Sequence, residues 1–136
     1  MTASPDTPDG LAQEIATVRA VYDAFDREDI EAALECMTPD VVLNLEATGR
    51  LAGRHEPYRG HDGVREYFAD TRRVWDDLRF APRSFHPGPG GVVARGDVRG
   101  RIGSQQIFAE ITWTWSFRGG LVSGIRASGL GEVRPA

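Results

Sequence analysis

The first candidate for acid–base chemistry is Glu46, the last but one residue of a strand-like stretch, VVLNLEA, at residues 41–47. Side chains alternate across a strand, so Glu46 points outward if Leu43 and Leu45 point inward. A bulge near Gly49 would reverse that direction. A carboxylate buried in this way has a raised pKa and is suited to act as a general base.

The second candidate is Asp97, which follows Arg95 in the stretch ARGDV. Residues two apart share one face of a strand, so this guanidinium and carboxylate are expected to pair. The same spacing is common on half-exposed strands that have no catalytic role. The motif therefore indicates either a surface ion pair or half of an acid–base site.

Metal binding and disulfide formation find little support. His55, His61 and His86 are the only histidines, and none has the spacing of a metal-binding motif. We therefore predict no metal site and no cofactor. His61 stands where a helix is expected to begin and is predicted to cap it. Cys36 is the only cysteine, so an intrachain disulfide is excluded and nothing indicates an oxidising compartment.

The composition is that of an ordinary globular domain. The 136 residues are 40% hydrophobic and 26% charged, with a net charge of −4. The arginines are spread along the chain, which argues against a nucleic-acid partner. No stretch approaches the roughly 20 apolar residues of a membrane span, and the start MTASPDTPDG has no signal-peptide pattern. We expect a cytoplasmic protein with a disordered leader at residues 1–10.

Three helices are expected to position these residues. One apolar face of the first helix carries Leu11, Ile15, Val18, Val21, Tyr22 and Phe25. Asp29 is predicted to cap a second helix over residues 30–37. A third helix begins near His61, and its expected buried stripe is Val64, Tyr67, Phe68, Thr71, Val74, Trp75 and Leu78.

Four strands are expected to close the chain, at 79–86, 91–100, 104–117 and 121–130, joined by short connections that contain glycine. With the strand at 41–47, the order is ααβα followed by an antiparallel meander. Helices gathered on one face of an antiparallel sheet define an α+β fold.

The strand at 104–117 shows which face is inside. Its alternation predicts an inward face of Ile107, Ala109, Ile111, Trp113, Trp115 and Phe117. The outward face is polar except for Phe108, which favours a subunit interface around Phe108, Glu110 and Thr112. Two indoles on one inner face are hard to pack in a small core. Trp113 and Trp115 therefore either fill the core or line a pocket.

Three segments of this sequence resemble the nuclear-transport-factor-2-like superfamily, and within it the SnoaL-like group. They read VYDAFDREDIEAALECMTPDVVL, YRGHDGVREYFADTRRVWDDL and ITWTWSFRGGLVSGIRA. The resemblance spans residues 11–133, which we take as one domain. It implies a cystatin-like cone, in which a curved sheet wraps around three helices and encloses an apolar cavity. It also implies a homodimer joined through the outer sheet face.

The resemblance also locates catalytic positions, and here they are apolar. The base of isomerase relatives falls on Leu45, their oxyanion-binding Asp on Trp113, and the acid of cyclase relatives on Ala127. Tyr22 stands one residue from the position of a catalytic Tyr. The resemblance places the loop with His55 near the cavity mouth.

We therefore predict a domain that binds a small apolar or aromatic molecule in a Trp-lined cavity. The predicted ligand-binding residues are Trp113, Trp115, Leu45, Tyr22, Phe25, Tyr58, Phe68, Trp75, Ile111 and Ala127. One alternative is an isomerase, cyclase, dehydratase or epoxide-hydrolase-like enzyme with a relocated acid or base, for which the candidates are Glu46, Asp97, Tyr22 and His55. The other is a dimeric structural or interaction module.

Overall fold

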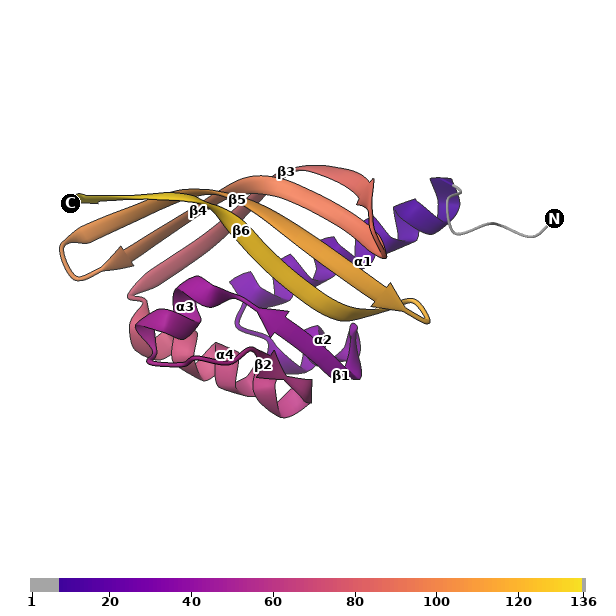
Figure 1. The fold of residues 1–136 in the computed structure, drawn as a ribbon, viewed down its shortest axis with the longest axis horizontal. Coiled ribbons are helices and arrows are strands. Elements are labelled where there is room, and N and C mark those ends of the chain that lie inside the picture. The colour runs from indigo at the N-terminus through magenta and orange to yellow at the C-terminus, as the bar shows by residue number, and fades with distance from the viewer. Residues whose placement is uncertain (1–7, 136) are drawn as a thin grey trace.

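The computed structural model describes residues 8–135, apart from the side chains of residues 8–9, 46–47 and 130–135. Its elements are α1 (Pro8–Asp26), α2 (Ile30–Glu35), β1 (Met37–Asn44), α3 (Glu46–Leu51), β2 (Tyr58–Arg59), α4 (Gly60–Val74), β3 (Asp77–Gly88), β4 (Gly91–Ile102), β5 (Gln105–Arg118) and β6 (Leu121–Pro135). The long strands form a curved, open sheet beside the helices (Figure 1). This arrangement confirms the predicted α+β cone.

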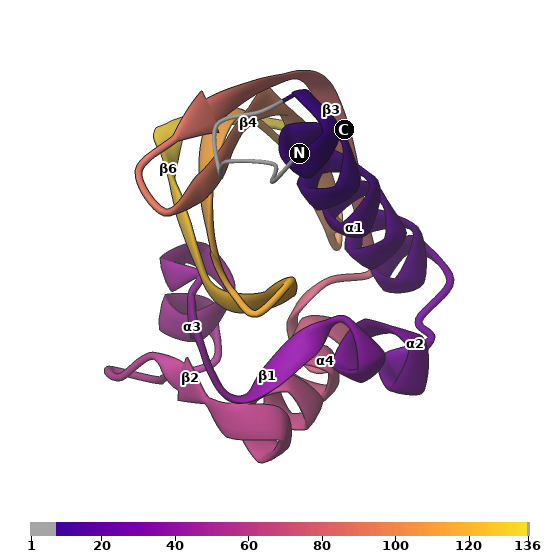
Figure 2. The same cartoon turned by 90° about the vertical axis from the view of Figure 1, so that its right-hand side faces the viewer.

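The sheet has the strand order β2-β1-β6-β5-β4-β3. All neighbouring strands are antiparallel except β1 and β6, which run parallel. The predicted hairpin connections contain Gly90, Gly103 and Gly119, whose φ angles of 76°, 61° and 61° favour glycine. Figure 2 shows the sheet bending round, with α1 against its concave side. No helix within residues 8–135 is long and apolar enough to cross a membrane.

Helices α1 and α2 agree with the predicted patterns except at one end of each. The predicted leader at 1–10 lies outside the described residues as far as residue 7, and α1 begins at Pro8. Asp29 caps α2 as predicted, since its carboxylate accepts a hydrogen bond from the Ala32 amide at 3.1 Å. The prediction that α2 runs to residue 37 is wrong, because Met37 already pairs with β6 in the sheet.

The predicted strand over residues 41–47 is wrong beyond Asn44, where the chain turns into the short helix α3. A tertiary contact explains the difference. The Thr48 hydroxyl in α3 accepts a hydrogen bond from the Trp75 indole nitrogen at 3.1 Å, and both side chains are buried. Local strand preference is a weak signal, and packing from another part of the chain overrides it here.

Helix α4 begins at Gly60, beside the predicted start at His61, but two details differ. His61 does not cap the helix, because its Nε2 lies 3.2 Å from the Met37 carbonyl oxygen and joins α4 to β1. The predicted stripe also extends too far. The helix ends before Trp75, which caps it with extended backbone, and Leu78 belongs to β3.

The alternation along β5 is confirmed. Trp113 and Trp115 are only 3% and 1% exposed, whereas Glu110 on the opposite face is exposed. The register shifts between Ser116 and Phe117, where β5 meets β6. The concave side of the sheet therefore carries the tryptophans, and the convex side carries the polar residues.

Candidate functional site

A cavity of about 190 Å³ lies between the concave face of the sheet and the helices, and we call it the inner chamber. Strands β3 to β6 supply most of its wall, and α3 with the end of α4 supplies the rest. Its apolar side chains include Trp75, Leu78, Phe80, Val98, Ile111 and Trp113. Alternation along the strands places these side chains inside, so the chamber is mainly apolar.

A smaller void of about 10 Å³ lies beside the chamber, and we call it the deep end. The walls of the two spaces share Leu45, Tyr67, Phe80 and Trp113. The Tyr22 ring stands edge-on to Trp113 and Trp115, with ring centroids 5.3 and 5.2 Å apart. A void of this size has room for about one water-sized atom.

The deep end holds two buried hydrogen-bonding atoms without partners. Neither the Tyr22 hydroxyl nor the Trp115 indole nitrogen forms a hydrogen bond with any described residue. Burial raises the pKa of Tyr22 well above its ordinary value, and the nearby Trp115 indole N–H offsets only part of that rise. Tyr22 therefore keeps its proton at neutral pH, although the indole lies outside hydrogen-bonding geometry to it.

Helix α3 forms the rim of the inner chamber on one side. Thr48 and Arg50 both line the chamber, and Thr48 is held by the hydrogen bond from Trp75. Trp75 packs closely against β4 at Gly100, which has no Cβ that would collide with its ring. The rim is thus fixed by packing between three elements that are distant in sequence.

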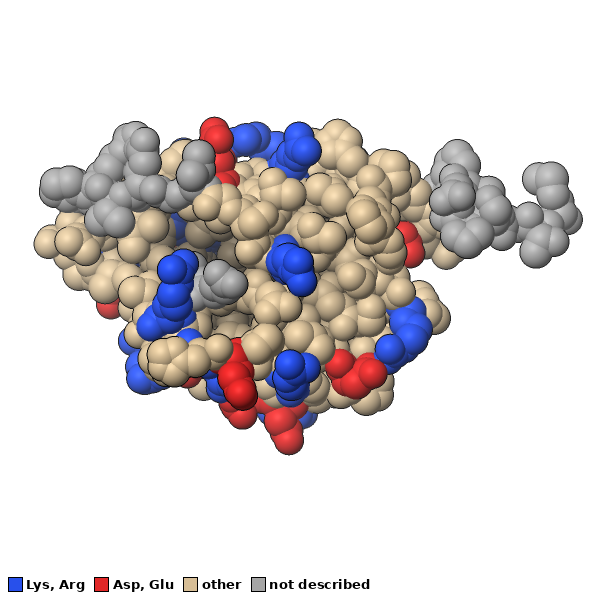
Figure 3. All heavy atoms as spheres, viewed as in Figure 1, with Lys and Arg blue, Asp and Glu red and all other residues tan. Residues whose placement is uncertain are grey.

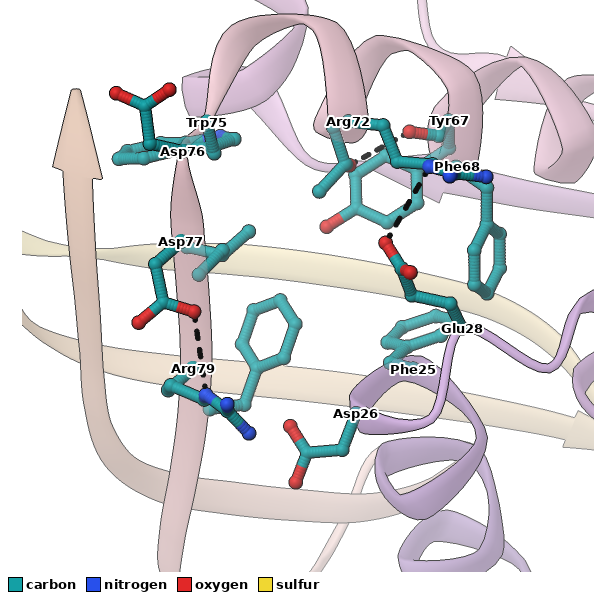
Figure 4. A pocket seen from close by; sticks show the side chains of 13 residues that line it. Phe25, Asp26, Glu28, Tyr67, Phe68, Arg72, Trp75, Asp76, Asp77 and Arg79 are labelled. Atoms are coloured by element: carbon teal, nitrogen blue, oxygen red, sulfur yellow. Dashed lines mark hydrogen bonds and ion pairs between the residues drawn. The ribbon is translucent and has the colours of Figure 1, made fainter. Parts of the chain in front are cut away.

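A second pocket, of about 290 Å³, lies between the end of α1, α4 and the start of β3, and we call it the polar pocket. Figure 4 shows aromatic rings on one side of it and charged side chains around them. Arg72 pairs with Glu28 at 3.7 Å, and Arg79 pairs with Asp77 at 3.4 Å. Asp26 points toward Arg79.

A third pocket, of about 340 Å³, lies beside the loop between α3 and β2, and we call it the loop pocket. Its wall includes His55, Arg54 and Tyr58. The Tyr58 hydroxyl donates a hydrogen bond to Asp70 at 2.8 Å, and Arg54 stacks on the Tyr58 ring at 4.2 Å. These polar groups are already paired with one another.

Charged side chains elsewhere follow the same pattern. On the face seen in Figure 3, basic and acidic residues are interspersed along the lower edge and do not form a basic patch. Two ion pairs on α4 illustrate this, from Arg65 to Glu31 and from Arg73 to Asp70. Among the described residues, no three acidic, histidine or cysteine side chains are grouped so as to hold a metal ion.

The sequence profile of the SnoaL-like domain matches residues 18–125, which is most of the chain. The chain belongs to the SnoaL-like family. Its cone is that of the nuclear-transport-factor-2-like superfamily. No curated protein matches this SnoaL-like chain.

Solved structures share the cone of this SnoaL-like domain. TerC co-crystallised with polyporic acid is 27% identical, with a TM-score of 0.77 over 87% of this chain and 92% of that one. A nuclear-transport-factor-2-like protein of Burkholderia pseudomallei is 23% identical, with a TM-score of 0.77 over 87% and 91%. A computationally designed 17-OHP binder is 13% identical, with a TM-score of 0.67 over 90% and 96%. The last two likenesses concern the fold alone.

Of the four residues predicted as catalytic candidates in this SnoaL-like domain, one is described at the chamber. Tyr22 lines the deep end. His55 is exposed in the loop pocket, and the side chain of Glu46 lies outside the described residues. Asp97 lies on the convex face and pairs with Arg83 of β3, so the predicted pair with Arg95 is wrong. The structure therefore does not bring the described candidates together.

The predicted ligand-binding residues are placed more consistently. All of them line one of the three pockets or the deep end, and all except Tyr58 and Phe68 line the inner chamber or the deep end. Tyr58 lies at the loop pocket and Phe68 at the polar pocket. Their role in binding stays a prediction.

Sequence reasoning missed several lining residues of this SnoaL-like domain. Phe80 and Val98 could have been found, because they alternate with polar residues in β3 and β4. Thr48 and Arg50 left no such signal, since the helix that carries them was predicted as a strand end and a loop.

Proposed function

We propose that this SnoaL-like domain binds a small, largely apolar molecule in the inner chamber. One observation carries the proposal: the chamber has apolar walls at Leu45, Trp113 and Ala127, the positions where the resemblance places catalytic groups. A ligand there would exchange water for contact with apolar side chains, which is the main source of affinity in such pockets.

The comparisons support a small-molecule ligand of this kind. TerC was crystallised with polyporic acid, and the designed relative of this fold is a 17-OHP binder. Binding is favoured over acid–base catalysis because Asp97 faces away from the chamber and His55 belongs to a different pocket. Tyr22 alone among the described candidates reaches the cavity, and its high pKa makes it a poor base.

Filling the chamber tests the proposal directly. Ala127→Trp adds an indole to the chamber wall, whereas Ala81→Trp adds one to the exposed side of β3. Calorimetric titration of the unaltered chain with tetralin, a bicyclic hydrocarbon, is expected to show binding. Ala127→Trp is expected to weaken that binding by at least about tenfold, since the space is no longer free. Equal loss in both variants, or none in Ala127→Trp, would contradict the proposal.

The proposal includes a cytoplasmic homodimer joined through the convex face of the sheet. Phe108 is half-buried there, covered in part by Arg99, whose guanidinium lies 5.4 Å from the ring centroid. A groove of about 640 Å³ runs past these two side chains. Light scattering at micromolar concentration tests the dimer, and Phe108→Asp is expected to shift it toward monomer. A monomer in the unaltered chain would exclude it.

A further inference from the structure

The deep end contains more hydrogen-bond donors than acceptors. An indole N–H can only donate, and a tyrosine hydroxyl donates one hydrogen and accepts through its oxygen. Even if the Trp115 N–H moved to bond the Tyr22 oxygen, the Tyr22 hydrogen would still need an acceptor. No carboxylate, amide or imidazole is among the residues described at the deep end. The other hydroxyl there, that of Tyr67, lies beside the side chains of Thr71 and Thr48 and forms no hydrogen bond with Tyr22.

Such a shortage is unusual in a folded protein, because buried donors are nearly always paired. Tyr22 is 7% exposed and Trp115 only 1%, so bulk water does not supply the missing partner. Phenylalanine would keep the apolar contacts of the Tyr22 ring, yet the chain places a buried hydroxyl here, beside the Trp115 indole. The void beside them has room for about one atom.

We propose that the deep end receives the carbonyl oxygen of a neutral ligand, while the apolar body of the same ligand fills the inner chamber. This rests on the proposed function, since the ligand occupies the same cavity. The Tyr22 hydroxyl and the Trp115 indole N–H donate to that oxygen, which can accept two hydrogen bonds through its two lone pairs.

The surroundings select a carbonyl over other oxygen groups. An alcohol would bring its own hydrogen and leave one more donor unpaired. A carboxylate would be buried without a cation, because no arginine, lysine or histidine is among the residues described at the deep end. The raised pKa of Tyr22 agrees with this choice, since its hydroxyl stays protonated and able to donate.

A matched pair of probes tests the assignment. Calorimetric titration compares 1-tetralone with tetralin, which has the same bicyclic frame without the oxygen. We expect 1-tetralone to bind more tightly by about 3- to 10-fold for each donor it engages. We expect 1-tetralol to bind less tightly than the ketone, and 1-naphthoate to bind least.

Two variants identify the donors. Tyr22→Phe and Trp115→Phe are each expected to reduce the preference for 1-tetralone over tetralin by about 3- to 10-fold, with little loss of tetralin affinity. Thr114→Val is the control, because it removes a hydroxyl from the convex face of β5, away from the deep end, and it should leave the preference unchanged. Thermal unfolding of each variant verifies that it is folded.

The outcomes separate this inference from the proposed function. Tetralin binding without any preference for the ketone would overturn the carbonyl site and leave apolar binding in place. A ketone preference that survives both Tyr22→Phe and Trp115→Phe would overturn the assignment of the donors. Binding of neither probe would contradict the proposed function as well.

Discussion

The inner chamber and the polar pocket share a wall, yet their polar groups differ in exposure to water and in pairing. Tyr67, Trp75, Leu78 and Phe80 line both. In the polar pocket, charged side chains reach water and pair with one another, as Arg72 does with Glu28. At the deep end, the Tyr22 hydroxyl and the Trp115 indole nitrogen are buried without hydrogen-bond partners.

This contrast indicates which of the two pockets has polar groups that require a ligand. Ion pairs near water form readily and contribute little free energy, so they are common on surfaces without a binding role. A buried donor without a partner costs about 1–3 kcal/mol, so it needs an explanation. The polar pocket has more charged side chains, but the unpaired donors of the deep end define more narrowly which ligand group would fit there.

The largest difference in stability between the two regions is expected for Trp115→Ala. Trp115 is 1% exposed, so its removal leaves a cavity in the aromatic cluster and should lower the free energy of unfolding by about 3–5 kcal/mol. Arg72→Ala is the control in the polar pocket and should cost less than about 1 kcal/mol. Urea denaturation measures both, and equal losses would remove the difference between the two regions.

The rim should respond next most strongly. Thr48→Val keeps the shape of the side chain but removes the acceptor of the Trp75 indole N–H, which is buried. We expect a loss of about 1–3 kcal/mol in the free energy of unfolding. Thr114→Val, on the convex face of β5, should change it by less than about 0.5 kcal/mol. A Thr48→Val protein as stable as the unaltered chain would mean that α3 is not held by this bond.

Tyr22→Phe should have a smaller effect of the opposite sign. Without ligand, the variant loses an unpaired buried hydroxyl and should be as stable as the unaltered chain, or more stable by about 1 kcal/mol. With saturating 1-tetralone, the unaltered chain should gain more stability than the variant. Thermal unfolding with and without the ketone measures both. A destabilised variant without ligand would show that the hydroxyl already has a partner.

The smallest effect is expected in the polar pocket, at Asp26. Burial, the largest cause, raises the pKa of this carboxyl; Arg79 opposes the rise and Asp23 and Asp77 add to it. Because the folded pKa lies above the unfolded one, the ionised group slightly destabilises the fold at neutral pH. That cost disappears as the pH falls through the folded value and below the unfolded value.

Asp26→Asn should therefore raise the free energy of unfolding at pH 7 by less than about 0.5 kcal/mol, since the site is open to screening by water. The gain should vanish near pH 3. Denaturation curves at the two pH values measure it. A gain that grows toward low pH would reverse the assigned sign.

The elements of the fold that could be predicted from the sequence are those with strong local patterns. Helix α1, the four long strands and the inward face of β5 were predictable because each repeats one spacing over many residues. The Asp29 cap was predictable because capping uses only neighbouring atoms. The predicted pair of Arg95 with Asp97 was wrong because a carboxylate on a strand can also pair with a guanidinium of the neighbouring strand. Here Arg83 of β3 pairs with Asp97.

The sequence by itself determined that Trp113 and Trp115 face the same way, since the two-residue period of a strand is a property of the backbone. The sequence also determined that apolar residues occupy the positions where the resemblance places catalytic acids, because residue types are read directly from the sequence. Tertiary structure alone decided that α3 forms the rim, and that the polar atoms of Tyr22 and Trp115 are buried beside a void without hydrogen-bond partners. Hydrogen-bond satisfaction depends on atoms brought together from distant segments, which no local pattern encodes.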